Sequence, residues 1–162
     1  MDKEQIRSQA AANKKANKKY FRKLKTKKLP QLDYLAQEIH DEVFERIDCL
    51  DCANCCKTTS PIFRDKDIDR LARHLRMRPA QFVEKYLRLD SESDYVLRQA
   101  PCPFLGPDNY CSVYEHRPRA CRDYPHTDRK QFYQLLDLTL KNTAVCPAVL
   151  AFVDTLKERL PL

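Results

Sequence analysis

Eight cysteines carry the most distinctive chemistry of this 162-residue sequence. Four of them fall in the run CLDCANCC at 49–56, and the other four are spread over the rest of the chain. A two-residue spacer turns two thiolates toward one centre, and soft sulfur ligands suit zinc and iron–sulfur clusters. We therefore predict that the metal ligands are Cys49, Cys52, Cys55, Cys56, Cys102, Cys111, Cys121 and Cys146.

Cys55 and Cys56 are adjacent in the sequence, which makes them awkward joint ligands of one ion. The side chains of adjacent residues tend to point away from each other. We infer that the two serve different sites, or that one of them is not a ligand.

Two metal interpretations stay open. The C-x-x-C-x-x-C spacing resembles the opening of a bacterial ferredoxin run, and Cys102 and Cys146 each precede a proline as the last ferredoxin ligand does. The compact ending of that run is missing. Alternatively, eight cysteines make two tetrahedral four-thiolate zinc sites, although the second C-x-x-C of a zinc ribbon is absent. The spacing favours an iron–sulfur cluster over zinc.

The N-terminus bears on the redox compartment. It begins MDKEQIRSQAAANKK, without the apolar region of a signal peptide, and no apolar run reaches the roughly 18 residues that span a bilayer. We therefore expect a cytoplasmic protein without a membrane segment. Cytosolic thiols stay reduced, which favours metal binding over the disulfide framework that eight cysteines suggest in a secreted chain. The one glycine, Gly106, excludes Gly-rich phosphate loops.

Positive charge is concentrated at the start of the chain. Residues 1–32 carry eleven Lys and Arg side chains and two acidic ones, a net +9 in a chain whose total is +7. We interpret residues 1–30 as a basic N-terminal arm or helix and residues 31–162 as the cysteine-cluster metal-binding domain. A solvated helix or tail is the favoured form of the arm. The alternative is that residues 3–28 bind nucleic acid, with Tyr20 and Phe21 stacking on bases.

The elements that must position the cysteines are mostly helices. Apolar residues at helical spacing predict helices at 32–47, 65–75, 79–87, about 128–143, and from Pro147 onward. Residues 49–61 are expected to form a loop, with Asp65 as a helix N-cap and a short strand at 95–97. Residues 101–125 hold five of the ten prolines and three cysteines, which is typical of an irregular stretch that presents ligands.

The predicted fold is mostly α, a compact helical domain with irregular cysteine-bearing loops around a metal site and a minimal strand pair. The metal site is expected to join the loop after the first core helix, the proline-rich middle and the start of the last helix. Metal would then stabilise the fold as well as serve as cofactor.

Arginines crowd one of the predicted ligands. Four thiolates around a zinc ion or a +2 cluster leave a net charge of about −2, so we predict that at least one of Arg117, Arg119 and Arg122 stabilises the sulfurs of the centre. The alternative is a surface pair with Asp123 or stacking on Tyr124. The histidines are interpreted as ordinary loop or helix residues. No acid–base pair or activated nucleophile is evident, so no catalytic residue is assigned.

The ordered motifs resemble one family. CLDCANCC at 49–56, CPFL at 102–105 and CSVYEHRPRACRDYP at 111–125 resemble the YkgJ-type cysteine-cluster proteins, also called C-x-x-C-x-x-C-C zinc- or iron-chelating domains. The segment DIDRLARHLRMRPAQFVEKYL at 67–87 resembles the helical insert of that family. The resemblance covers about residues 49–147 and implies a metal-chelating domain, often described as containing iron–sulfur, with no agreed reaction.

Two positions depart from the family pattern. Ala53 stands where glycine is common, and Arg78 stands where a Ser or Thr cap is common before Pro79. Neither departure removes a ligand. Flagellin lysine N-methylases carry a related cysteine domain inside a longer enzyme, but this chain shows no segment for S-adenosylmethionine, so that activity is not carried over.

The predicted function is a metal-binding protein that serves as an electron-transfer or structural module and works with a redox partner protein. One alternative is a component of an iron–sulfur-dependent oxidoreductase or modifying enzyme, and whether the chain is an enzyme stays open. The other alternative is a zinc-stabilised adaptor that binds nucleic acid through its basic arm.

Overall fold

The computed structural model describes residues 3–27 and 29–162, and the chain divides into two units. Unit 1 comprises residues 1–48 and 125–162, and unit 2 comprises residues 49–124. Residue 28, which belongs to the segment expected to bind nucleic acid, lies outside the described residues, as do residues 1 and 2. The elements are helices apart from one pair of short strands, so the prediction of a mostly α fold is confirmed.

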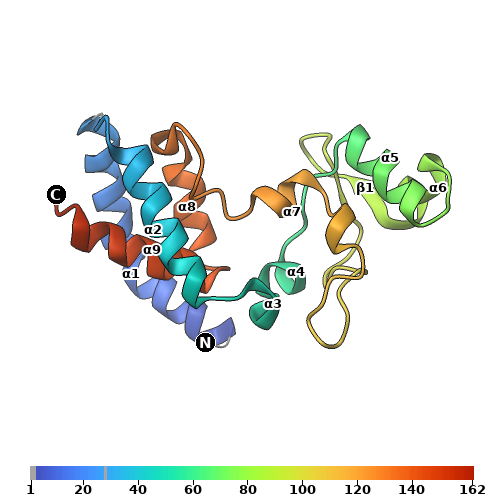
Figure 1. The fold of residues 1–162 in the computed structure, drawn as a ribbon, viewed down its shortest axis with the longest axis horizontal. Coiled ribbons are helices and arrows are strands. Elements are labelled where there is room, and N and C mark those ends of the chain that lie inside the picture. The colour runs from blue at the N-terminus through green and yellow to red at the C-terminus, as the bar shows by residue number, and fades with distance from the viewer. Residues whose placement is uncertain (1–2, 28) are drawn as a thin grey trace. The chain divides into compact units, whose positions relative to one another are not determined.

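Unit 1 is a helical bundle. Its elements are α1 (Lys3–Lys27), α2 (Leu32–Arg46), the 3-10 turn η2 (Phe132–Leu135), α8 (Leu136–Asn142) and α9 (Pro147–Arg159). Figure 1 shows α1 in blue alongside α8 and α9, and α2 runs next to α9 in red. The apolar stripe of α2 that the sequence predicts is buried, with Leu32, Ala36, Ile39 and Val43 all at most 4% exposed. Burial of such a stripe is what fixes an amphipathic helix.

Helix α1 is packed, which corrects its interpretation as a solvated arm. Ile6 and Leu24 are each 1% exposed, and Ile6 packs with Ala10 and Leu150 of α9. The buried positions recur at helical spacing, but they are diluted by lysines, and for this reason the composition of the segment indicated a fully polar helix.

The two aromatic residues of α1 face inward as well. Phe21 is 3% exposed, and the Tyr20 hydroxyl donates a 2.9 Å hydrogen bond to the Leu160 carbonyl. This burial contradicts the alternative interpretation, in which these rings stack on nucleic-acid bases.

Unit 2 is built from short elements around a core of its own. They are α3 (Cys49–Cys52), α4 (Asn54–Thr58), α5 (Asp65–His74), α6 (Pro79–Tyr86), β1 (Leu87–Leu89), β2 (Tyr95–Leu97), the 3-10 turn η1 (Tyr114–His116) and α7 (Arg119–Asp123). The antiparallel strands pair Leu87 with Leu97. Two of the cysteines, Cys102 and Cys111, pack against the core, which consists of Phe63, Ile68, Leu71, Ala72, Phe82, Leu87, Leu97, Phe104 and Val113.

Three local expectations are wrong. The segment 49–61 contains two short helical turns in place of a loop. The helix expected from residue 128 begins at Phe132, because Gln131 takes a left-handed conformation (φ 58°) and Asp33 of α2 accepts the backbone N–H groups of both residues. Residue 64, rather than Asp65, is the N-cap of α5.

Candidate metal centre

The run CLDCANCC folds as two helical turns joined at one unusual residue. Ala53 connects α3 to α4 with φ 47° and ψ 19°, a left-handed conformation that favours glycine. Its N–H donates to the Cys49 carbonyl at 2.9 Å, and its carbonyl accepts from Lys57 N–H at 3.1 Å. The turn at Ala53 thus sets the direction of the first two cysteines of the run relative to the last two.

The neighbouring thiols do not diverge as expected. The sulfurs of Cys55 and Cys56 lie 4.0 Å apart. Two sulfurs on one tetrahedral zinc ion, at Zn–S distances of about 2.3 Å, are separated by about 3.8 Å. Adjacency in the sequence therefore does not exclude a shared centre, and the division of Cys55 and Cys56 between two sites stays a prediction.

Backbone hydrogen bonds join the proline-rich segment to this run. Cys102 N–H donates to the Cys56 carbonyl at 2.8 Å, and the Asn109 side chain donates to the Asp51 carbonyl at 3.2 Å. Both contacts lie within unit 2. They place the residues 102–109 against the turns that carry the first four cysteines.

Gly106 closes the loop between Cys102 and Cys111. Its N–H donates to the Tyr110 carbonyl at 2.7 Å, next to a bridge between Leu105 and Cys111. A Cβ atom at this position would lie 2.6 Å from the Asp108 carboxylate and 3.3 Å from the Tyr110 carbonyl. A close approach, and not its backbone angles, therefore favours glycine at this position.

The segment that leads to Cys121 is held by an ion pair. Asp67, whose side chain is 4% exposed, binds Arg70 at 2.7 Å and accepts the Arg119 N–H at 3.1 Å. Arg70 also donates to the carbonyls of His116 and Arg117, at 3.2 and 3.0 Å. Burial alone would raise the pKa of Asp67, but these hydrogen bonds outweigh it and hold that pKa below its usual value.

Four of the thiols influence one another's ionisation. The neighbouring thiol of Cys55 donates a hydrogen bond that lowers the pKa of Cys56 to about 7. Burial, with a smaller contribution from negative charge on Cys56, raises the pKa of Cys102 to about 11 and that of Cys121 to about 12. Burial and the Cys56 charge also raise the pKa of Cys111. Cys56, Cys102, Cys111 and Cys121 are therefore near enough for the charge on one thiolate to disfavour ionisation of the others.

The eight thiols form no disulfides, and their donor chemistry fits a soft cation. Within residues 3–27 and 29–162, no three Cys, His, Asp or Glu side chains are arranged so that they could hold a metal ion. The thiol group nevertheless suits zinc or iron, because a bound cation removes the repulsion between thiolates and favours their deprotonation.

The eighth cysteine belongs to the other unit. Cys146 is 8% exposed and stands at the N-cap of α9, directly before Pro147. The other seven cysteines lie in unit 2, where Cys49 is exposed and the rest are half-buried.

The three arginines of the prediction have different surroundings. The Arg117 guanidinium lies over the Tyr114 ring, 3.7 Å from its centroid, and its charge lowers the pKa of Cys111 and Cys121 against the larger opposing effect of burial. Arg119 forms the surface pair with Asp123 at 3.1 Å that was the alternative interpretation. Arg122 is exposed. Arg117 is thus the arginine whose charge acts on the thiols.

Sequence reasoning missed Asp67, Arg70 and the contact between two histidines. The rings of His74 and His116 lie 4.1 Å apart, at the junction of α5 and η1. The one available signal was the carboxylate at the third position of α5, which indicates a helix cap and which accepts the Arg64 N–H at 3.2 Å. Nothing in the spacing indicated its partner at Arg119.

The fold and the thiols define a class, a helical protein with a cysteine-rich metal-chelating unit. The family model described as "CxxCxxCC: Putative zinc- or iron-chelating domain" matches residues 48–145, and the chain belongs to this family. The resemblance expected from the sequence is thereby confirmed. No curated protein and no solved structure matches the chain. No helix in the described part of the chain is long and apolar enough to cross a membrane.

Proposed function

We propose that unit 2 holds an iron–sulfur cluster with Cys56, Cys102, Cys111 and Cys121 as its first ligands, and that it serves as an electron-transfer or structural module. The observation that carries this proposal is the backbone hydrogen bond that holds Cys102 against Cys56, with Cys111 and Cys121 near enough for a charge on Cys56 to raise their pKa values. That hydrogen bond joins two separate segments, and the core of unit 2 packs against Cys102 and Cys111.

The electrostatics of the four thiols support a bound cation. Burial and neighbouring charge hold the pKa values of Cys102 and Cys121 far above neutral, so these groups stay protonated when no cation is present. Binding a metal exchanges those protons for a cation, and the binding free energy then stabilises the fold that brings the segments together. The Arg117 charge offsets part of the net charge that four thiolates leave.

Iron–sulfur is preferred to zinc because of the cysteines that lie next to these four ligands in the sequence. Cys49, Cys52 and Cys55 recur every third residue, as in a ferredoxin run, and they would supply ligands to a second centre. Zinc on the same four thiolates is the competing assignment. Both assignments use the same cysteines, so they are distinguished by the metal and not by mutagenesis.

The test begins with the full-length protein purified without oxygen. An iron–sulfur cluster gives iron and acid-labile sulfide in equal amounts and a visible absorbance that dithionite bleaches. Colourless protein with stoichiometric zinc would show that the same cysteines hold zinc and not a cluster. Protein that carries no metal, with its cysteines paired as disulfides, would refute the proposal.

Single Cys→Ser variants then test the ligand assignment. We expect Cys102→Ser and Cys121→Ser to lose the chromophore, whereas Cys49→Ser, at the exposed end of the run, retains it. The opposite pattern, with the chromophore lost in Cys49→Ser and kept in Cys121→Ser, would contradict the assignment.

A further inference from the structure

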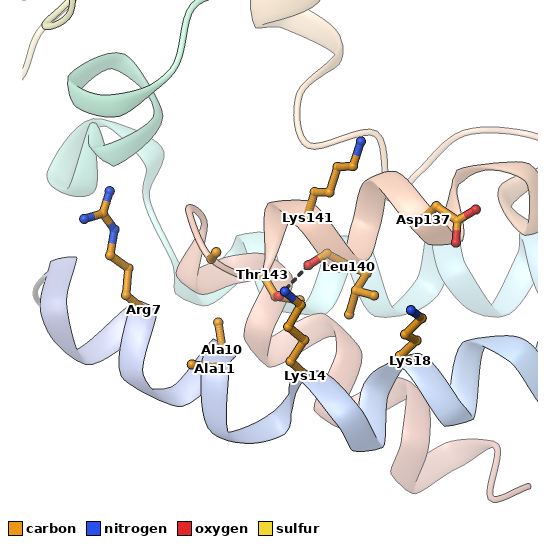
Figure 2. A pocket seen from close by; sticks show the side chains of 10 residues that line it. Arg7, Ala10, Ala11, Lys14, Lys18, Asp137, Leu140, Lys141 and Thr143 are labelled. Carbon is orange, nitrogen blue, oxygen red and sulfur yellow. Dashed lines mark hydrogen bonds between the residues drawn. The ribbon is translucent and has the colours of Figure 1, made fainter.

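A basic cleft lies between α1 and α8 in unit 1. It has a volume of about 470 Å³, and Figure 2 shows Arg7, Lys14 and Lys18 along α1 and Lys141 on α8 around it. Small side chains of α1, Ala10 and Ala11, lie between the cationic ones. The small side chains leave space next to the α1 backbone, and positively charged side chains surround that space.

None of the four cations, Arg7, Lys14, Lys18 and Lys141, forms an ion pair with a carboxylate in the part of the chain that the structure describes. The one carboxylate of the lining, Asp137, is bound by Lys25 at 2.8 Å. That hydrogen bond, together with the nearby charges of Lys25, Lys141 and Lys18, holds the pKa of Asp137 below its usual value. The carboxylate therefore stays ionised and paired with Lys25. The remaining cations repel one another and leave a site for an anion.

The spacing of the cations indicates a polyanion more than a single phosphate. From Arg7 to Lys18 the helix rises about 16 Å, at about 1.5 Å for each residue. A nucleic-acid strand places one phosphate about every 3.4 Å along a duplex axis, so several phosphates face a row of this length. No aromatic side chain lines the cleft, and Tyr20 and Phe21 are buried in the bundle, so no base-stacking platform is present there.

We propose that the cleft formed by Arg7, Lys14, Lys18 and Lys141 binds the sugar–phosphate backbone of a nucleic acid without reading its sequence. The binding is independent of the metal centre, because every lining residue belongs to unit 1. Contacts of ammonium and guanidinium groups with phosphates weaken steeply as salt rises, because bound counterions are released.

The test measures the affinity of the full-length, anaerobically purified protein for a labelled single-stranded RNA of about 20 nucleotides by fluorescence anisotropy at several salt concentrations. The triple variant Lys14→Gln/Lys18→Gln/Lys141→Gln should bind at least tenfold more weakly at low salt. It should also lower the slope of log affinity against log salt by about 2, as expected for three lost single-strand phosphate contacts.

The matched control removes the same charge from the same unit outside the cleft. Lys15→Gln/Lys19→Gln/Lys27→Gln changes three exposed lysines of α1 that do not line it and should change affinity by less than about threefold. Ala11→Glu, which places a carboxylate in the cleft without removing a lysine, should weaken binding as the triple variant does. Circular dichroism of each variant checks that α1 remains helical.

Four results would overturn the proposal. Equal losses in the cleft and control variants would make the interaction a general charge effect. Competition by inorganic phosphate at the same charge concentration as RNA would assign the cleft to a small anion, and equal competition by poly-glutamate would assign it to an acidic protein. Absence of RNA binding by the wild-type protein at low salt would also refute it.

Discussion

The Asp67 carboxylate accepts the backbone N–H of Arg119 at 3.1 Å, across 52 residues of sequence. The same side chain binds Arg70, which in turn donates to the carbonyls of His116 and Arg117. One buried carboxylate therefore holds the end of η1 and the start of α7 against α5. Because α7 carries Cys121, this contact fixes the position of the backbone segment from which this predicted ligand extends.

Replacing Asp67 tests that role. Asp67→Asn keeps the shape of the side chain but removes its charge, and we expect it to lower the free energy of unfolding by about 2 kcal/mol, the range for hydrogen bonds to a charged group. Metal retention should fall with it, because the Cys121 segment is loosened. Urea unfolding and metal analysis measure both effects. Asp69→Asn, an exposed carboxylate on the same helix, is the control and should change neither.

The low pKa of Asp67 gives this prediction a pH signature. A carboxyl group whose folded pKa lies below its usual value of 3.8 contributes stability above that value and loses it as pH falls through the folded pKa. The stability difference between wild type and Asp67→Asn should therefore stay constant from pH 7 to about 5 and narrow below about pH 4. Comparison with Asp69→Asn removes the effect of metal release in acid. A difference that is undiminished at pH 3 would show that charge is not the cause.

The backbone at Ala53 makes a second prediction about the cysteine run. A left-handed conformation costs an ordinary residue about 1 kcal/mol and a β-branched one more. Ala53→Gly should therefore be tolerated, since the relief of strain offsets the lost methyl group, whereas Ala53→Val should cost about 2 kcal/mol and reduce metal retention.

Ala80, exposed in α6, supplies the control for this pair. Ala80→Val should cost only a few tenths of a kcal/mol, and Ala80→Gly should cost more than Ala53→Gly despite the burial of Ala53. Thermal unfolding of the four variants ranks them. If Ala53→Val matched Ala80→Val, the left-handed turn would not be a constraint on the fold.

The charge of Arg117 leads to a third prediction, on the metal centre. Arg117 lowers the pKa of Cys111 and Cys121, so its removal should make those thiolates harder to form and weaken metal binding by about tenfold. Arg122→Gln is the matched control, because this exposed arginine lies one residue from Cys121. Competition with a chelator measures affinity, and a cluster would in addition show a more negative reduction potential in Arg117→Gln. Equal behaviour of the two variants would assign Arg117 to packing on Tyr114 alone.

The sequence pattern predicted those helices that are determined by residues within the helix itself. The buried stripe of α2 and the start of α9 at Pro147 follow from apolar spacing and from proline chemistry, and both are confirmed. The burial of α1 could not be predicted from composition, since its apolar positions are few and its partners, α8 and α9, are more than a hundred residues away.

The candidate site shows the same division. The identity of the thiols follows from sulfur chemistry and spacing, whereas their grouping depends on contacts between distant segments. The Cys102 to Cys56 hydrogen bond and the Asp67 to Arg119 hydrogen bond join residues that no local pattern connects. Pairing of this kind is decided by tertiary packing, which a single sequence does not display.

Tyr20 provides the last prediction, a test of how α1 is attached to α9. Its hydroxyl donates to the Leu160 carbonyl at 2.9 Å, and burial raises its pKa to about 12 from the usual 10. Tyr20→Phe should lower stability by about 1 kcal/mol at neutral pH because that hydrogen bond is lost. A raised pKa stabilises the folded state below pH 10, and this contribution is lost between pH 10 and 12. The stability advantage of wild type over Tyr20→Phe should therefore shrink as pH rises from 7 to above 11. Urea unfolding at both pH values measures this change, with Tyr34→Phe, at a ring that is 75% exposed, as the control that shows none. If wild type kept the same advantage over Tyr20→Phe at both pH values, the hydroxyl would not be buried between α1 and α9.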